Sequence, residues 1–121
     1  MASSEEKKTD QRRLPRHALS EPVNVYDRAT QSFMGRLVNI HAEGLMIMGN
    51  QAFEDENIYQ LDLQLPRPIN GHDMIAIGVD CLWSRSEEAH VHWAGCRVID
   101  ISDEALRDLE ALIELFGQGT V

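Results

Sequence analysis

An alternation of apolar and polar residues between Ile58 and Leu65 constrains the fold of this chain more than any other feature. The apolar positions are Tyr59, Leu61, Leu63 and Leu65, and the polar positions between them are Gln60, Asp62 and Gln64. Successive side chains of a β-strand point to opposite faces of its sheet. The pattern therefore predicts a strand with one face in the core and the other in solvent.

Five further short apolar segments have the length and composition of strands. They cover residues 22–28, 32–40, 44–48, 75–83 and 91–101. Residues typical of turns separate them, at 41–44, 49–50, 66–71 and 84–88. Six short strands at near-regular spacing indicate an all-β antiparallel barrel or sandwich.

The period changes after Ser102, where apolar residues recur at helical spacing as far as Phe116. Ser102 suits an N-cap and Gly117 suits a C-cap, so a helix is predicted over about 102–116. The β body then covers about 20–101, and the whole domain covers 12–117. Residues 1–11 contain almost nothing apolar and are predicted to form a flexible tail.

Charge is distributed unevenly along the chain. Residues 1–16 hold five basic and three acidic side chains, whereas the remainder holds six basic and 17 acidic side chains, a net charge of −11. Such an acidic body disfavours DNA, RNA and anionic membranes, which bind mainly basic patches. A small phosphate compound at the clustered arginines remains compatible with this distribution.

The sequence also bears on location and redox state. It has no apolar run of transmembrane length, and its first residues are polar rather than signal-like, which predicts a cytoplasmic protein without membrane insertion. Cys81 and Cys96 both lie in apolar strand-like segments. They are predicted to be buried, reduced thiols.

Two spaced motifs carry the groups most suited to ligand binding. Arg12-x-x-x-Arg16 precedes the first strand, and Asn39-x-His41-x-x-Gly44 lies at the turn between the second and third strands. Arginine can donate two parallel hydrogen bonds to a guanine edge or clamp a phosphate. The amide of Asn39 complements guanine, and Gly44 permits a tight turn with close backbone approach. These groups suit a compact phosphate ligand with guanine faces.

Both motifs, in this order relative to the strands, resemble the signature of the PilZ family over about residues 11–117. The resemblance implies a six-stranded antiparallel β-barrel with a C-terminal α-helix, and a site for the bacterial second messenger cyclic di-GMP. It implies that Arg12 and Arg16 bind guanine and phosphate with help from Arg13, and that Asn39 contacts the guanine. Trp83 is placed similarly to a tryptophan near the ligand in some members.

His41 departs from the family pattern, which usually has serine at that position. The imidazole is larger than a hydroxyl but still offers one donor and one acceptor, so His41 is included among the predicted ligand-binding residues. Gly95 resembles the glycine that often begins the family's last core strand.

The resemblance implies a non-enzymatic receptor that needs no cofactor and passes its signal to a downstream effector protein. Ligand is expected to draw the N-terminal arginine segment onto the barrel. An alternative, motivated by His41, is a protein–protein adaptor with the PilZ fold that does not bind nucleotide. A remoter alternative is a metal-dependent enzyme using His90 and His92, although the sequence shows no catalytic constellation.

Overall fold

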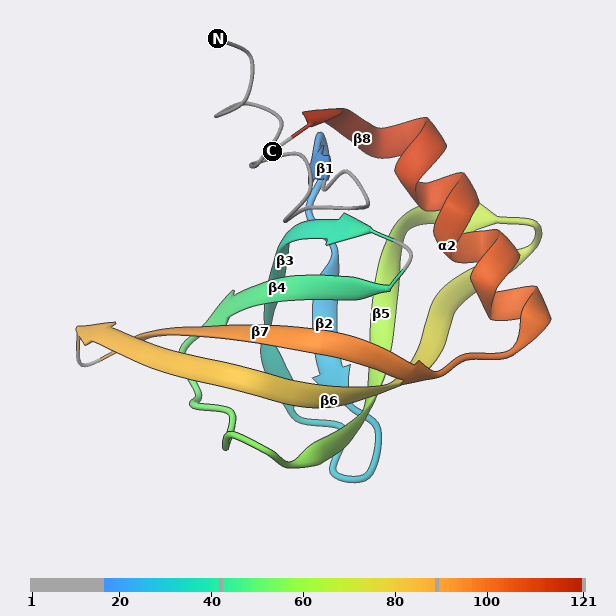
Figure 1. Cartoon of the computed structure of the whole chain (residues 1–121). Coiled ribbons are helices and arrows are strands. Elements are labelled where there is room, and N and C mark those ends of the chain that lie inside the picture. Colours follow the sequence, from blue (N-terminus) through green and yellow to red (C-terminus); the bar gives the residue numbers. More distant parts are fainter. Residues whose placement is uncertain (1–16, 42, 89, 121) are drawn as a thin grey trace, which may run out of the picture.

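The computed structural model describes residues 17–41, 43–88 and 90–120, and in this part of the chain six antiparallel strands close into a barrel (Figure 1). These strands are β2 (Asn24–Asp27), β3 (Phe33–His41), β4 (Gly44–Gly49), β5 (Ile58–Ile69), β6 (His72–Glu88) and β7 (Val91–Asp100). Their spatial order is β2-β5-β6-β7-β4-β3, and pairing between β2 and β3 closes the ring. The predicted six-stranded antiparallel barrel is confirmed.

The barrel interior contains the apolar half of each alternating pattern. In β5, Leu61, Leu63 and Leu65 are at most 7% exposed, as the period-two pattern predicted. Other fully buried side chains include Val23, Val25, Ile40, Ile47, Ile75, Val79 and Cys81. Burial of these side chains is the main favourable contribution to folding.

Two glycines allow β3 and β4 to approach closely where the barrel closes. Gly35 has a φ of 146°, which L side chains rarely adopt, and a Cβ on it would lie 2.9 Å from the Cα of Gly49. Near this point β3 changes partner, because its first half pairs with β2 and its second half pairs with β4. A strand that joins two neighbours in this way needs a sharp bend, which glycine supplies.

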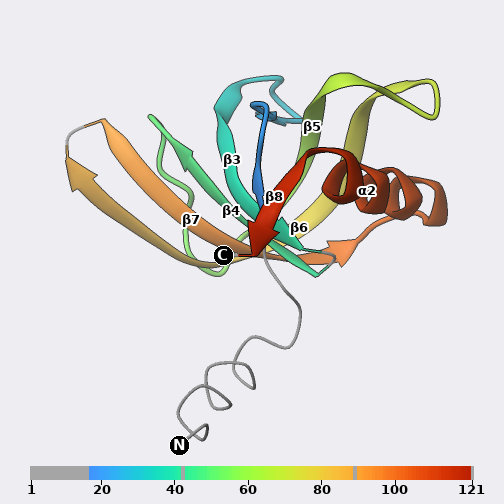
Figure 2. The same cartoon turned by 90° about the horizontal axis from the view of Figure 1, so that it is seen from above.

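A single described helix, α2 (Asp103–Phe116), packs along one side of the barrel against β5 and β6 (Figure 2). Ser102 is its N-cap, because the Ser102 hydroxyl accepts a hydrogen bond from the Ala105 backbone N–H at 3.0 Å. Leu109 and Leu112 are fully buried. The predicted C-terminal helix and its N-cap are confirmed.

Two short strands were not predicted. β1 (His17–Leu19) pairs with the second half of β3, and β8 (Gly117–Thr120) pairs with β1 beyond the barrel. Gly117 does end α2, but in an extended conformation, so the chain continues directly as a strand. Three residues are too few to show a period, and the sequence of β8 has no apolar side chain.

Two predicted turns need correction. The turn predicted over 66–71 is confirmed only at its end, where Asn70 and Gly71 join β5 to β6. β5 runs through Pro66 and Pro68 as far as Ile69, and these prolines lie where β5 has separated from β2 and its register with β6 shifts. Proline is tolerated in a strand at such an irregular, singly paired stretch.

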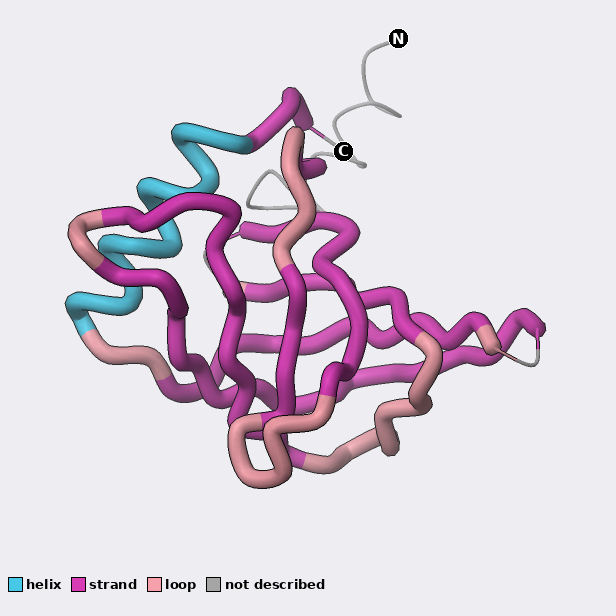
Figure 3. Tube along the Cα trace, turned by 180° about the vertical axis from the view of Figure 1, so that it is seen from behind, coloured by secondary structure: helices cyan, strands magenta, loops and turns pink. Residues whose placement is uncertain are grey.

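The turn predicted over 84–88 is wrong, because these residues belong to β6, which continues to Glu88. β6 and β7 together form a hairpin that projects beyond the barrel (Figures 1 and 3). Because most side chains of this extension are exposed, it lacks the alternation of apolar residues that reveals a strand in sequence.

Candidate ligand-binding site

Strand register gathers most of the predicted site residues on the outer surface of four neighbouring strands. One cross-strand row contains Trp83 of β6, Gly95 of β7, Met46 of β4 and Asn39 of β3. A second row contains Asp80, Arg97, Gly44 and His41 from the same strands. The row between them is buried in the core and contains Cys81, Cys96, Leu45 and Ile40. We call the two outer rows the site face.

The site face is hollowed into a pocket with a volume of ≈ 440 Å³. Trp83 and Leu82 line it from β6, and His41 lines it from β3. Since β7 and β4 lie between those strands, the tryptophan and the histidine face each other across two strands. Arg97 lines the pocket between them. The pocket therefore combines an aromatic ring, an imidazole and a guanidinium group.

The indole of Trp83 lies directly over Gly95. A Cβ on Gly95 would overlap the Nε1 and Cε2 atoms of the ring and lie 2.8 Å from its Cζ2 atom. The absence of a side chain at Gly95 thus makes room for the indole, and 38% of Trp83 remains exposed to solvent. An exposed indole beside a pocket offers a π-face on which a base can stack.

His41 is oriented by the turn that follows it. Its Nδ1 atom accepts a hydrogen bond from the backbone N–H of Glu43 at 3.2 Å, so the neutral ring carries its proton on Nε2. A Cβ on Gly44 would lie 3.1 Å from that Nε2 atom and 3.0 Å from the carbonyl oxygen of Cys96. A side chain at position 44 would thus be in tight contact with both the imidazole and the backbone of β7, and glycine avoids this contact.

Asn39 is on the site face but is 5% exposed and does not line the pocket. Its Nδ2 atom lies 3.5 Å from the sulfur of Met46, which does line the pocket. Within the described residues its Oδ1 atom is buried and has no hydrogen-bond partner. A buried carbonyl oxygen without a donor is costly, so Asn39 is an acceptor that a ligand or an added segment can satisfy.

Arg97 was not predicted as a site residue. Its Nη2 atom lies 3.1 Å from Oδ2 of Asp80, the neighbouring residue in its row, and 58% of its side chain is exposed. Exposed ion pairs of this kind are weak, so the guanidinium can exchange Asp80 for an anionic ligand. Its place two residues after Gly95, on the same face of β7, is the only sequence signal for it.

The predicted Arg12, Arg13 and Arg16 lie outside the described residues. The described chain begins at the next residue, His17, which pairs with Ile40. Ala18 then pairs with Asn39, so β1 extends the first row of the site face by one more strand. The arginine segment is thus covalently attached at the edge of the site face.

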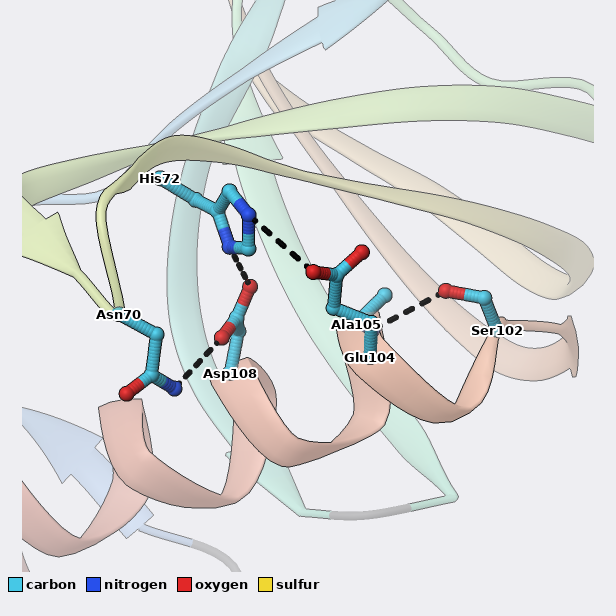
Figure 4. Close-up of polar contacts among 6 residues, drawn as sticks. All are labelled: Asn70, His72, Ser102, Glu104, Ala105 and Asp108. Carbon is cyan, nitrogen blue, oxygen red and sulfur yellow. Dashed lines mark hydrogen bonds and ion pairs between the residues drawn. The ribbon is translucent and has the colours of Figure 1, made fainter.

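A second polar cluster lies between α2 and the β5–β6 turn (Figure 4). Asp108 of α2 is 3% exposed; it accepts a hydrogen bond from Nδ2 of Asn70 at 2.8 Å and lies 2.7 Å from Nδ1 of His72. Nε2 of His72 lies 3.4 Å from Glu104. Burial alone would raise the pKa of Asp108, but the contacts with Asn70 and His72 and the nearby charge of Arg107 outweigh it and lower that pKa.

This cluster fixes the helix to the barrel. Each partner of Asp108 belongs to the β5–β6 turn region, whereas Asp108 belongs to α2. A buried carboxylate with two such partners is stabilising only while both are present. The cluster is therefore a structural connection, separate from the site face.

The histidines of the metal-enzyme alternative lie at the tip of the β6–β7 hairpin. Nδ1 of His92 lies 2.7 Å from the hydroxyl of Ser86, and His90 is exposed. Across the residues that the structure describes, no three histidine, cysteine or acidic side chains are arranged to hold a metal ion.

The two cysteines are free and buried, as predicted, and they face each other across β6 and β7. Burial raises the pKa of Cys96 to about 12, with the neighbouring Cys81 as a further cause. Burial, followed by the charge of Asp55, also raises the pKa of Cys81. Both side chains are thus held as neutral thiols that pack in the core.

Comparisons with known proteins agree with this architecture. The inhibitor of motility MotI/DgrA of Bacillus subtilis matches with a TM-score of 0.64 at 15% identity, and YcgR of Escherichia coli, in complex with c-di-GMP, matches with 0.63 at 16%. Both matches cover 86% of this chain. PlzA of Borreliella burgdorferi, in complex with c-di-GMP, matches with 0.51 at 10% over 95% of this chain. At these identities the likeness is one of fold.

This chain spans about half the length of those structures, with 50%, 45% and 56% of them covered. No curated protein matches it. Among the described residues, no helix is long and apolar enough to cross a membrane. The PilZ domain model, however, matches residues 10–115, which is most of the chain. The chain belongs to the PilZ family.

Proposed function

We propose that this chain is a non-catalytic, cytoplasmic receptor for cyclic di-GMP in bacterial second-messenger signalling. The observation that carries the proposal is the pocket of the site face, where Trp83 on Gly95 faces His41 across Arg97. Its volume of ≈ 440 Å³ is in the range of small-molecule sites. Two structural neighbours with this fold, YcgR and PlzA, are complexes with the same ligand.

Each group of the pocket suits one part of this ligand. The exposed face of Trp83 stacks on a guanine base. The guanidinium of Arg97 exchanges its exposed ion pair with Asp80 for a phosphate, which it can bind through two parallel hydrogen bonds. His41 presents its imidazole to the ligand as part of the pocket lining. Asn39 lies beside the pocket and does not line it, so its buried Oδ1 can accept from a guanine N–H only when ligand binding uncovers it.

The arginine segment completes the site in this proposal. Arg12 and Arg16 bind the guanine edge and the phosphates, and Arg13 assists them. Since β1 joins this segment to the edge of the site face, ligand binding fixes the segment over the barrel. The new surface is then presented to a downstream effector protein. The ligand can shift the arginine segment toward the ordered state only by as much as it binds that state more tightly than the state without order.

Titration calorimetry of two arginine variants tests this arrangement. Deletion of residues 1–16 is expected to abolish binding, and Arg16→Lys is expected to weaken it at least about tenfold, because lysine cannot form the bidentate fork. Arg67→Lys is the matched control, since Arg67 is exposed on β5 and pairs only with Glu21 in the described structure. Undiminished affinity after the deletion would show that the arginine segment plays no part in the site.

The adaptor without nucleotide remains the second candidate, and the position of His41 favours it. The imidazole occupies the space next to Gly44 that a smaller serine would leave open to a ligand. His41→Ser distinguishes the two functions. In a receptor, the variant binds cyclic di-GMP with affinity similar to that of the natural chain. If the natural chain is an adaptor, it does not bind cyclic di-GMP, and only the His41→Ser variant does.

A further inference from the structure

The outer surface of the barrel continues past the site face into a third cross-strand row. It contains Arg85 of β6, Trp93 of β7, Met48 of β4 and Arg36 of β3. The adjacent positions Ala94, Ile47 and Leu37 are buried in the core, so alternation directs the members of the third row outward. We call these four residues the arginine–tryptophan row.

Three residues of this row have an exposed apolar surface or a polar group without a partner. Met48 is 39% exposed. The Nε1 atom of Trp93 is buried and lacks a hydrogen-bond partner in the part of the chain that the structure describes. Arg36 is exposed and has no ion pair among those residues. The buried Trp93 N–H is out of reach of an outside acceptor, but an exposed, unpaired cation beside exposed apolar surface is a group that a carboxylate from outside can pair with.

The fourth member, Arg85, is available at little cost. Its Nη2 atom lies 3.2 Å from Oε2 of Glu87, and the two side chains are 60% and 49% exposed. Ion pairs this exposed contribute at most about 1 kcal/mol, so Arg85 can exchange Glu87 for another carboxylate. The row thus has two cations that a carboxylate can pair with, Arg36 and Arg85, on either side of a tryptophan and a methionine.

The arginine–tryptophan row is positively charged, whereas the rest of residues 17–121 is acidic. Residues 17–121 contain only six basic side chains against 17 acidic ones, yet two of the six lie in this row. Arginine, tryptophan and methionine are also the residue types enriched at protein–protein interfaces. Extended nucleic acid does not fit, because the acidic body would repel it.

We propose that the arginine–tryptophan row is a docking surface for an acidic segment of a partner protein. Carboxylates of the segment pair with Arg36 and Arg85, and an apolar side chain packs on Met48, beside the ring of Trp93. The proposal builds on the proposed signalling function, in which a downstream effector is the partner. Since the row and the site face are two residues apart on shared strands, about 7 Å, a ligand on one borders a partner on the other.

The two tryptophans of the chain allow the two sites to be followed separately. Each indole N–H gives its own signal in a ¹H–¹⁵N correlation spectrum, with Trp83 reporting on the site face and Trp93 on the row. The probe is a short capped peptide of alternating Glu and Leu, and its control is the same peptide with Gln in place of Glu. We expect the acidic peptide to shift the Trp93 signal saturably and the control peptide to leave it in place.

Charge reversal then tests the assignment of the cations. Arg36→Glu should weaken the acidic peptide at least about tenfold. Arg107→Glu, on α2, should have no effect; Arg107 is also exposed and without an ion pair in the described residues. Equal shifts with both peptides, or undiminished binding to Arg36→Glu, would overturn the proposal. So would a Trp93 signal that depends on protein concentration without peptide, because a second copy would then occupy the row.

Failure of the proposed receptor function would look different. Cyclic di-GMP should shift the Trp83 signal whether or not peptide is present. If cyclic di-GMP leaves the Trp83 signal unchanged while the acidic peptide shifts the Trp93 signal, the nucleotide site is refuted and the docking surface is not.

Discussion

Gly95 is the position at which a single methyl group should disable the pocket. A Cβ there would occupy the place of the Nε1 and Cε2 atoms of Trp83, so Gly95→Ala must displace the indole. The backbone itself tolerates alanine, because Gly95 is not among the described glycines with positive φ. Since 38% of Trp83 is already exposed, the ring can swing outward without disrupting the core. The substitution thus removes the stacking platform and leaves the barrel folded.

The size of the effect follows from the lost stacking. Stacking of a base on an aromatic side chain contributes about 1–3 kcal/mol, so Gly95→Ala should weaken cyclic di-GMP by roughly 5- to 150-fold. The free energy of unfolding should fall by about 1 kcal/mol, the low end of overpacking costs, because the displaced ring has solvent to enter. In a Trp83→Ala background the same change should stabilise the chain slightly, since alanine reduces the entropy of the unfolded chain.

A double-mutant cycle provides the assay. Calorimetric affinity and urea denaturation are measured for the natural chain, Gly95→Ala, Trp83→Ala and the double variant. Because both substitutions remove the same stacking platform, the two single variants should lose similar affinity and the double variant should lose no more than either. Natural affinity in Gly95→Ala, or additive losses in the double variant, would refute the reasoning.

Two further predictions concern the connection of the helix and the thiols. Asp108→Ala removes the buried acceptor for Asn70 and His72, and it should lower the free energy of unfolding by about 1–3 kcal/mol in urea at neutral pH. Because folding lowers the pKa of Asp108, its ionic contribution is present above the unfolded pKa of about 3.9 and is lost as pH falls through the folded pKa. The difference between variant and natural chain should therefore shrink in acid, and a difference that grows there would contradict the assignment. Since burial raises the pKa of Cys96 to about 12, iodoacetamide at pH 8 should modify it at least about a hundredfold more slowly in the folded chain than in urea. Mass spectrometry measures both rates, and equal rates would show that this thiol is accessible.

The sequence was most informative where side chains alternate around a core. The Leu61–Leu65 pattern predicted the core face of β5 correctly, because the strand has one buried and one solvated side. The pattern fails where that contrast is absent. The extension of β6 beyond Trp83 is largely exposed, and β1 is only three residues long, so neither has an apolar period.

The sequence likewise predicted only part of the candidate site. A spaced motif predicted His41 and Gly44, and the family resemblance predicted Trp83; all three line one pocket. Arg97 was missed, because its place beside the pocket depends on its pairing with Asp80 and Gly44 across strand register. Register depends on bulges, and those on β6 and β3 at this face leave no clear mark in the sequence.

The sequence also could not show why residue 95 has to be a glycine. Family resemblance singled out this glycine, but only the position of the Trp83 ring explains why no Cβ fits there. Likewise, the buried Oδ1 of Asn39 becomes informative only when its surroundings show that no described donor reaches it.

Isothermal titration of the natural chain with cyclic di-GMP, beside GTP as a control, tests the central claim most directly. We expect saturable binding of cyclic di-GMP with a Kd of about micromolar or tighter, and no binding of GTP. An absence of heat, together with failure to compete at high ligand concentration, would contradict the receptor function. The PilZ-fold adaptor would then be the function to pursue.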